Sequence, residues 1–204
     1  MRWLVGVFLW VMALDVRAGE VFLIPEYNPK PLYPVELHRA GITGKLQVSL
    51  TVHADGSVSK VAVMEDAHPD LSEASVTAVS QWRFKPWEIT SDHPAEIAVI
   101  APIDFRLDSQ LPFHANKQLA KLKCASIARA ASGTPVATWV DLPVFDWTRS
   151  YLTYSLSPAQ LPDEERLELI NTLNASVPSI VRRCKSYPAS RYVRFLPEEI
   201  RVLL

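Results

Sequence analysis

The sequence predicts an α+β fold in which a three-stranded antiparallel sheet with two helices precedes a helix-rich, disulfide-stapled region. Two observations predict the first part: apolar residues alternate along three short runs, and prolines and glycines bound two stretches with helical spacing. The third observation is that helical spacing dominates after residue 107, where both cysteines lie. With 49% hydrophobic residues among 204, the chain can bury a substantial core.

The N-terminal residues indicate export. Arg2 precedes an apolar run over residues 4–14, which is about half as long as the roughly 20 residues that a membrane-spanning helix needs. Small residues at positions 16 and 18 follow this run. Residues 1–18 therefore predict a signal peptide that is cleaved after Ala18, with an uncleaved inner-membrane signal anchor as the alternative.

Charge divides the rest of the chain. Residues 19–107 carry 7 basic and 12 acidic residues, whereas residues 108–204 carry 12 basic and 9 acidic residues. We therefore expect a short extended linker over residues 19–29, a domain over residues 30–107 and a helix-rich region over residues 108–204. The formal charge of the whole chain is −1, so no strong field recruits nucleic acid.

A short helix and a strand open the predicted domain. Pro34 begins a helix over residues 35–40 and Gly41 ends it, because proline suits the first turn and glycine the position after the last. Apolar and polar residues then alternate over residues 46–52, which predicts a half-buried strand.

A hairpin follows this strand. The pair Asp55-Gly56 is a strong signal for a tight turn between antiparallel strands. The return strand covers residues 58–63, and its alternation slips once at Ser59-Lys60. This slip predicts a β-bulge.

The second helix is predicted to begin near Asp70 and to be stopped by Pro86. Asp70 and Glu73 have the spacing of a capping box, and apolar residues recur at steps of three and four as far as Trp82. Arg83 and Lys85 then fall in the last turn and just after it, where the helix dipole favours cations.

A last strand runs over residues 96–107 and closes the predicted sheet. Its apolar side chains share one face: Ile97, Val99, Ala101, Ile103 and Phe105. Pro102 lies within it and has no N–H to donate, which favours a position at the sheet edge.

The order of these features over residues 30–107 resembles the TonB C-terminal domain family. The resemblance is carried by four groups of residues: Pro31-x-Tyr33-Pro34; Ala40-Gly41-Ile42-x-Gly44; Trp82-Arg83-Phe84-Lys85-Pro86; and Pro102-Ile103-x-Phe105-x-Leu107. It implies a periplasmic protein. It also implies a role in TonB-dependent transmembrane transport, and the family includes energy transducers.

The resemblance also implies a binding mode and a partner. Family members add an extended segment of an outer-membrane receptor, the TonB box, to a free sheet edge, a mode called β-augmentation. The residues that correspond to this peptide-binding edge and its approach are Tyr33, Pro34, Ile97, Val99, Ala101, Ile103 and Phe105. The alternative is that Pro102 only blocks aggregation at this edge.

The segment between the apolar run and the domain is short for an energy transducer. Fully extended, residues 15–30 span roughly 50 Å at about 3.3 Å per residue, which is less than the width of the periplasm. We expect no direct pulling role unless another protein supplies the missing reach.

Residues 108–204 resemble no family that we recognise. Helical spacing predicts one helix over residues 115–131, a second over residues 157–174 that is interrupted near Pro162, and a short third over residues 177–185. An alternating run over residues 191–195 predicts a strand. An aromatic-rich stretch, residues 139–154, is interpreted mainly as core.

The two cysteines predict one disulfide. Cys124 and Cys184 are the only cysteines, and the default for such a pair in an exported chain is a bond between them. Two separate buried thiols are the alternative.

The search for catalytic and metal-binding motifs predicts no enzyme, no metal site, no cofactor and no small-molecule substrate. The sequence has none of the standard hydrolase, zinc-protease, phosphate-loop or dinucleotide signatures, and its five histidines are scattered. The leading hypothesis is therefore a protein-interaction module that captures an extended segment. The alternative is an assembly protein whose sheet edge pairs with its own C-terminal half or with a second copy, as a homodimer.

Overall fold

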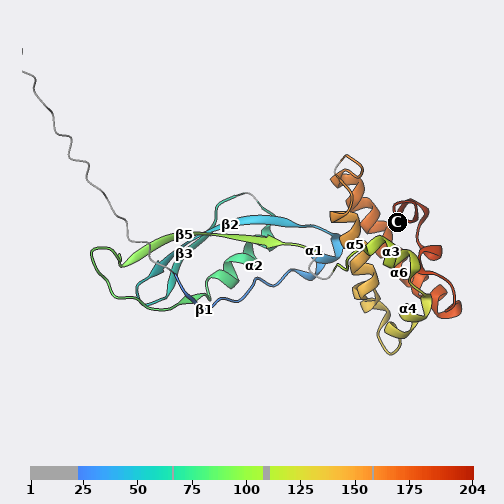
Figure 1. The fold of residues 1–204 in the computed structure, drawn as a ribbon, viewed down its shortest axis with the longest axis horizontal. Coiled ribbons are helices and arrows are strands. Elements are labelled where there is room, and N and C mark those ends of the chain that lie inside the picture. Colours follow the sequence, from blue (N-terminus) through green and yellow to red (C-terminus); the bar gives the residue numbers. More distant parts are fainter. Residues whose placement is uncertain (1–22, 66, 108–110, 158) are drawn as a thin grey trace, which may run out of the picture.

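The computed structural model describes residues 23–65, 67–107, 111–157 and 159–204. The predicted signal peptide, residues 1–18, lies outside these residues, as do the polar residues 108–110. Figure 1 shows an elongated part built on the strands, and a group of helices at the end of the sheet where α1 lies. We call these parts the sheet half (residues 23–107) and the helical half (residues 111–204).

The sheet has the predicted three antiparallel strands. Strand β2 (Gly44–His53) lies in the middle, between β3 (Val58–Val63) and β5 (Glu96–Phe105). The register of β2 against β3 shifts between Ser49 and Thr51, and Lys60 opposite this shift has a φ of 51°. The predicted bulge is therefore confirmed, and the α+β fold class with it.

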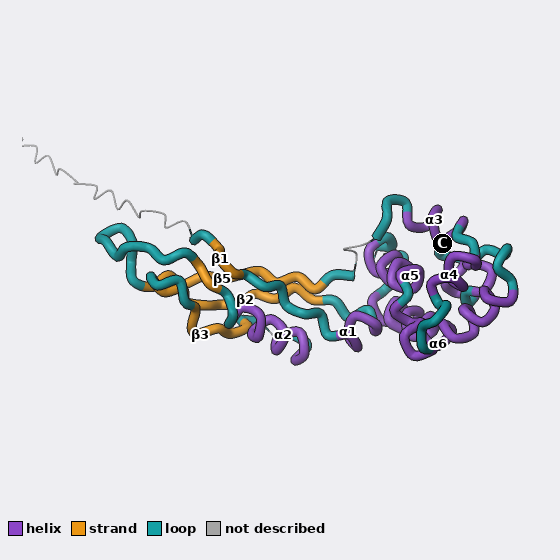
Figure 2. Tube along the Cα trace, turned by 90° about the horizontal axis from the view of Figure 1, so that it is seen from below, coloured by secondary structure: helices purple, strands orange, loops and turns teal. Residues whose placement is uncertain are grey.

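Two helices and a two-stranded ribbon complete the sheet half. Helix α1 (Val35–Ala40) follows Pro34 and ends at Gly41, whose φ is 73°, as predicted. Strand β1 (Pro25–Tyr27) pairs with the two-residue strand β4 (Arg83–Phe84). Helix α2 (Pro69–Val79) lies along the sheet, as Figure 2 shows.

Two details predicted for α2 are wrong. The N-cap is His68, whose side chain accepts a hydrogen bond from the backbone N–H of Asp70, so Asp70 and Glu73 form no capping box. The helix also ends at Val79, before Trp82 and Arg83. The indole N–H of Trp82 instead donates to the carbonyl of Pro29 at 3.0 Å. The next residue, Arg83, begins β4.

The sheet half has its own core. Side chains of β2 and β5 that point to the same face pack with α1, α2 and the residues after α2. The most buried members are Leu46, Val48, Leu50, Val52, Leu71 and Val79.

The helical half contains the elements α3 (Ala115–Lys121), α4 (Cys124–Ala130), the 3₁₀ helix η2 (Val136–Asp141), α5 (Pro143–Tyr154), α6 (Asp163–Ser186), the 3₁₀ helix η3 (Tyr192–Phe195) and α7 (Glu198–Arg201). Cys124 and Cys184 form the predicted disulfide, which joins α4 to α6. The aromatic-rich stretch contributes Trp139, Phe145 and Tyr151 to the core, as predicted.

Three predictions for this half are wrong. The helix predicted over residues 115–131 is broken at Leu122 and Lys123, because the chain there pairs with residues 190–192: Tyr192 N–H donates to Leu122 and Cys124 N–H to Ser190. Residues 192–195 form η3 and no strand, apart from a single bridge between Lys123 and Arg191.

The third correction concerns α6, which is one helix of 24 residues where two were predicted. It continues through Pro178 because apolar side chains on both sides of the proline face the same core. Leu173 and Val177 precede it, and Ile180 and Val181 follow, all nearly or fully buried. Burial of this continuous apolar face outweighs the one backbone hydrogen bond that the proline removes.

The two halves meet where α1 packs against α6 (Figure 2). The carbonyls at the end of α1, which have no partner within the helix, accept from α6: Asn174 donates to Arg39 O at 2.8 Å and Arg166 to Gly41 O at 2.8 Å. Arg39 in turn donates to both carboxylate oxygens of Asp141, at 2.8 and 2.7 Å. The halves are therefore joined by directed polar contacts.

Candidate functional site: the outer edge of β5

Strand β5 offers a free backbone edge. Among the described residues, β5 pairs only with β2, and the helical half contributes no strand to this sheet. The alternative in which the edge pairs with the chain's own C-terminal half is therefore not found within the described residues. The edge runs along a strand of 10 residues.

The pairing register shows which residues of β5 face outward. Gln47 O accepts a hydrogen bond from Met64 N, so the backbone of Gln47 points toward β3 and away from β5. Gln47 and its partner Pro102 are thus a non-hydrogen-bonded pair, in which both backbones point away from each other. Every second residue then faces the open edge: Glu96, Ala98, Ile100, Pro102 and Asp104.

Pro102 interrupts the row of outward donors. Its neighbours along the edge, Ile100 and Asp104, each present an N–H and a C=O, whereas Pro102 presents a C=O alone. A partner strand added here would therefore lose one hydrogen bond near the end of β5.

The predicted side chains of β5 lie on the inner face. Ala101, Ile103 and Phe105 are buried, at 6, 8 and 4% exposure, and Ile97 and Val99 are partly buried. They anchor the strand on the core and leave its backbone available. The exposed face carries other side chains, and Ile100 is the large apolar one, at 55% exposure.

Tyr33 and Pro34 lie in the segment that approaches the end of β5. The Tyr33 hydroxyl donates to Ile42 O at 2.6 Å, and the ring meets Phe105 edge-on at 5.2 Å between centroids. Burial raises the pKa of Tyr33 well above its ordinary value. Pro34 is the N-cap of α1. The Tyr33 side chain is therefore uncharged and held in place beside the end of β5.

A groove of about 740 Å³ follows the last part of the edge. Its walls are the extended residues 28–33 on one side and the end of β5 on the other. Its charged lining residues are Lys30, Asp104 and Arg106, and the others are Asn28, Pro31, Tyr33, Trp82, Pro102, Ile103 and Phe105. We call this space the edge groove.

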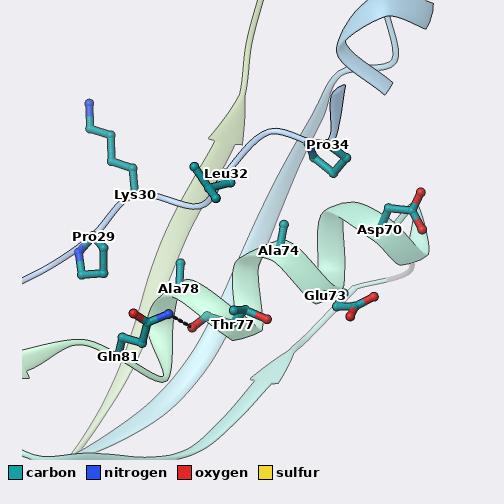
Figure 3. A pocket seen from close by; sticks show the side chains of 10 residues that line it. All are labelled: Pro29, Lys30, Leu32, Pro34, Asp70, Glu73, Ala74, Thr77, Ala78 and Gln81. Atoms are coloured by element: carbon teal, nitrogen blue, oxygen red, sulfur yellow. Dashed lines mark hydrogen bonds between the residues drawn. The ribbon is translucent and has the colours of Figure 1, made fainter. Parts of the chain in front are cut away.

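A second groove of about 560 Å³ lies on the opposite side of the same extended segment, against α2. Figure 3 shows Ala74 and Ala78 pointing from α2 toward the segment that carries Leu32, with Asp70 and Glu73 at the far end of the helix. Leu32 is 87% exposed. This second groove is apolar and acidic-ended, and it offers no free strand edge.

The sheet half is similar in sequence to known proteins. A family model described as the Gram-negative bacterial TonB protein C-terminal matches residues 29–107. Residues 29–107 belong to the TonB C-terminal domain family. The protein tonB2 of Pseudomonas aeruginosa is 35% identical over 83 residues, and the protein TonB of Xanthomonas campestris is 30% identical over 95 residues.

The chain spans less than half of these curated relatives, 30% of the first and 42% of the second. The solution NMR structure of Pseudomonas aeruginosa TonB CTD aligns at 21% identity with a TM-score of 0.36, over 48% of this chain and 94% of that chain. The family comprises transport-associated domains that are not enzymes. The match leaves residues 108–204 outside the TonB domain.

The polar side chains near the TonB domain's edge are occupied by structural contacts. His53 Nε2 lies 2.7 Å from the Ser59 hydroxyl, and its other nitrogen lies 3.5 Å from Glu96. Within the described ranges no three potential metal-ligating side chains converge. None of the helices seen in those ranges is both long and apolar enough to span a bilayer.

The sequence prediction missed the residues that shape the edge groove from the extended side. Asn28, Lys30 and Trp82 were not predicted as site residues, yet all three line it. The bond from Trp82 to Pro29 fixes the segment there. Two signals are present in the sequence: Trp82 lies in a motif of the family resemblance, and the cluster of prolines over residues 25–34 indicates an extended segment. Neither shows that the two lie against each other.

Proposed function

We propose that this chain is a periplasmic TonB-like interaction module that binds an extended segment of an outer-membrane receptor, such as a TonB box, by strand addition in TonB-dependent transport. The observation that carries the proposal is the outer edge of β5, which has no strand partner among the described residues and borders a groove. The TonB family of residues 29–107 supports a transport role. The TonB domain would make the contact with this partner, through the edge of β5.

Backbone hydrogen bonds would supply the affinity. An added strand can pair with Ala98, Ile100 and Asp104, each of which presents an N–H and a C=O outward, and with the C=O of Pro102. Each net hydrogen bond contributes about 0.5–1.5 kcal/mol, so a short segment binds weakly and reversibly. Such affinity suits a partner that must be captured and released.

Side-chain contacts would supply the selectivity. Ile100 and Ala98 lie on the exposed face of β5, where alternate side chains of an added strand would pack. Lys30, Asp104 and Arg106 border the edge groove and place both signs of charge near the end of the strand. The Cys124–Cys184 disulfide supports an oxidising compartment.

A backbone-directed variant tests strand addition. Ile100→Pro removes an outward N–H but no hydrogen bond to β2, so the sheet should persist while TonB-box peptides bind at least tenfold more weakly by calorimetry. Ile100→Val keeps the N–H and is the matched control, with affinity close to that of the wild type. Equal affinity of the proline variant and the wild type would rule out strand addition at this edge.

The same free edge also favours pairing with a second copy of the chain. Light scattering over a range of protein concentrations distinguishes the two functions. A dimer that Ile100→Pro abolishes, together with no peptide binding at millimolar concentration, would replace receptor binding with self-assembly.

A further inference from the structure

The chain just beyond β5 is held by the helical half through its backbone. Leu107, two residues after the end of β5, is 2% exposed. Its N–H donates to the Tyr154 hydroxyl at 3.2 Å, and its carbonyl accepts from the Ser150 hydroxyl at 2.7 Å. The accepting Tyr154 hydroxyl and the donating Ser150 hydroxyl both belong to helix α5. One helix thus satisfies both backbone polar groups of Leu107.

This contact lies between the two cores. Leu107 belongs to neither of the two clusters of buried residues, although it is as buried as their members. The preceding residue strengthens the link, because the guanidinium of Arg106 lies 4.8 Å from the centre of the Tyr154 ring. Ser150 is itself buried at 1% exposure, so its hydroxyl has no access to water as a substitute partner.

The end of β5 depends on such a contact. Among the residues that the structure describes, β5 is bonded on one side only, to β2, and strand ends open more readily than strand centres. The last part of β5 is also the part that borders the edge groove, through Pro102, Asp104 and Phe105. If this end of β5 were mobile, the strand edge would not hold one fixed backbone geometry for an incoming segment.

We propose that Ser150 and Tyr154 are positioning residues that hold the C-terminal end of β5 in its binding geometry. The helical half thereby preorganises the edge of the TonB domain for an added strand. Neither residue lines the edge groove, so both act through Leu107 and not by touching the partner. The inference rests on the proposed function only for its binding consequence, because the hold on β5 is a property of the unliganded chain.

Native-state hydrogen exchange on the full chain tests the hold without any partner. The amides of Ile103 and Phe105 point toward β2 and shortly precede Leu107, which Ser150 and Tyr154 hold. The Met64 amide bonds instead to Gln47, on the other side of β2. In Ser150→Ala we expect Ile103 and Phe105 to exchange about tenfold faster, with Met64 unchanged. Tyr154→Phe removes the other hydroxyl alone and should give the same local pattern.

The control for loss of a serine hydroxyl remote from β5 is Ser132→Ala, at an exposed position. Ser132 also donates its hydroxyl to a backbone carbonyl, that of Ala128 at 2.8 Å, but lies far from β5 in the chain and next to α4. This variant should leave the exchange of Ile103 and Phe105 at the wild-type rate. Equal acceleration at Met64 in the Ser150 variant would show a general loss of stability and overturn the proposal.

Peptide affinity then tests the binding consequence. Ser150→Ala and Tyr154→Phe should each weaken TonB-box peptide binding about fivefold by calorimetry, while Ser132→Ala leaves it unchanged. Locally faster exchange with unaltered affinity would contradict preorganisation. If the wild type binds no peptide at all, the proposed function fails, and the exchange of Ile103 and Phe105 still decides whether the helical half holds β5.

Discussion

Pro102 is the residue that most limits the β5 edge. Its nitrogen faces outward at the position where an added strand would accept a hydrogen bond, between the outward donors of Ile100 and Asp104. We expect Pro102→Ala to restore this donor and to strengthen peptide binding about three- to tenfold, as measured by calorimetry. An unchanged affinity would mean that the added segment does not reach this position.

Gly41 lies directly against α6, where the two halves meet. Its φ is 73°, and a Cβ built there would overlap Ile170 Cδ1 on α6. We expect Gly41→Ala to lower the free energy of unfolding by about 2–4 kcal/mol in urea, from backbone strain and the displaced Ile170. Gly133→Ala is the control, because Gly133 has a φ of 77° but nothing within 4 Å, so that it reports strain alone. An equal loss of unfolding free energy in both variants would show that Ile170 on α6 moves aside at no energetic cost.

Asp141 makes the contact between the halves depend on pH. Hydrogen bonds from the Arg39 guanidinium hold the pKa of Asp141 below its ordinary value. The ion pair therefore stabilises the fold fully above the ordinary aspartate pKa of about 3.9, and the contribution disappears as the pH falls through the lowered pKa. Because the Asp141 side chain is 42% exposed, the effect is at most about 1 kcal/mol.

Urea unfolding of the wild type and of Asp141→Asn at two pH values measures this contribution. The variant should be less stable at pH 7 and nearly equal to the wild type near pH 2. A gap that stays constant with pH would mean that the carboxylate charge contributes nothing to the contact.

At the scale of elements, the disulfide between α4 and α6 closes a separation of 60 residues. On the chain-entropy model this closure stabilises the fold by about 4 kcal/mol. We expect Cys124→Ala with Cys184→Ala to lower the free energy of unfolding by about that amount in urea. The Met64 amide, which bonds to Gln47 on the β3 side of β2, should keep its exchange rate in native buffer, because the disulfide lies wholly in the helical half. A loss below about 1 kcal/mol would contradict the predicted effect.

The sequence predicted elements best where local chemistry decides them. The hairpin at Asp55-Gly56, the bulge near Lys60 and the helix between Pro34 and Gly41 all follow from backbone preferences of a few residues. The predictions failed where distant contacts decide: the break at Leu122 depends on pairing with Tyr192, and α6 passes Pro178 because of its buried face. The β5 edge was predicted from Pro102, but the wall of the edge groove depends on the long-range bond from Trp82 to Pro29.

At the scale of the whole molecule, a TonB domain and a disulfide-stapled helical half share one interface. The polar contacts of Arg39, Gly41 and Leu107 with the helical half tie the end of α1 and the end of β5 to the same helices. An extended partner on the β5 edge would therefore bind next to a stiff support. We infer from this arrangement that the helical half helps to shape the β5 edge. Neither the sequence of this half nor the family match, which ends at residue 107, indicates such a role.

Amide-resolved NMR titration of the full chain with a receptor TonB-box peptide tests the central claim most directly. The account predicts that the outward amides of Ala98, Ile100 and Asp104 shift and gain exchange protection. The amides of Ala74 and Ala78, which line the second groove against α2, should stay unperturbed. Shifts confined to Ala74 and Ala78, or no shifts at millimolar peptide with the sheet intact, would contradict strand addition at β5.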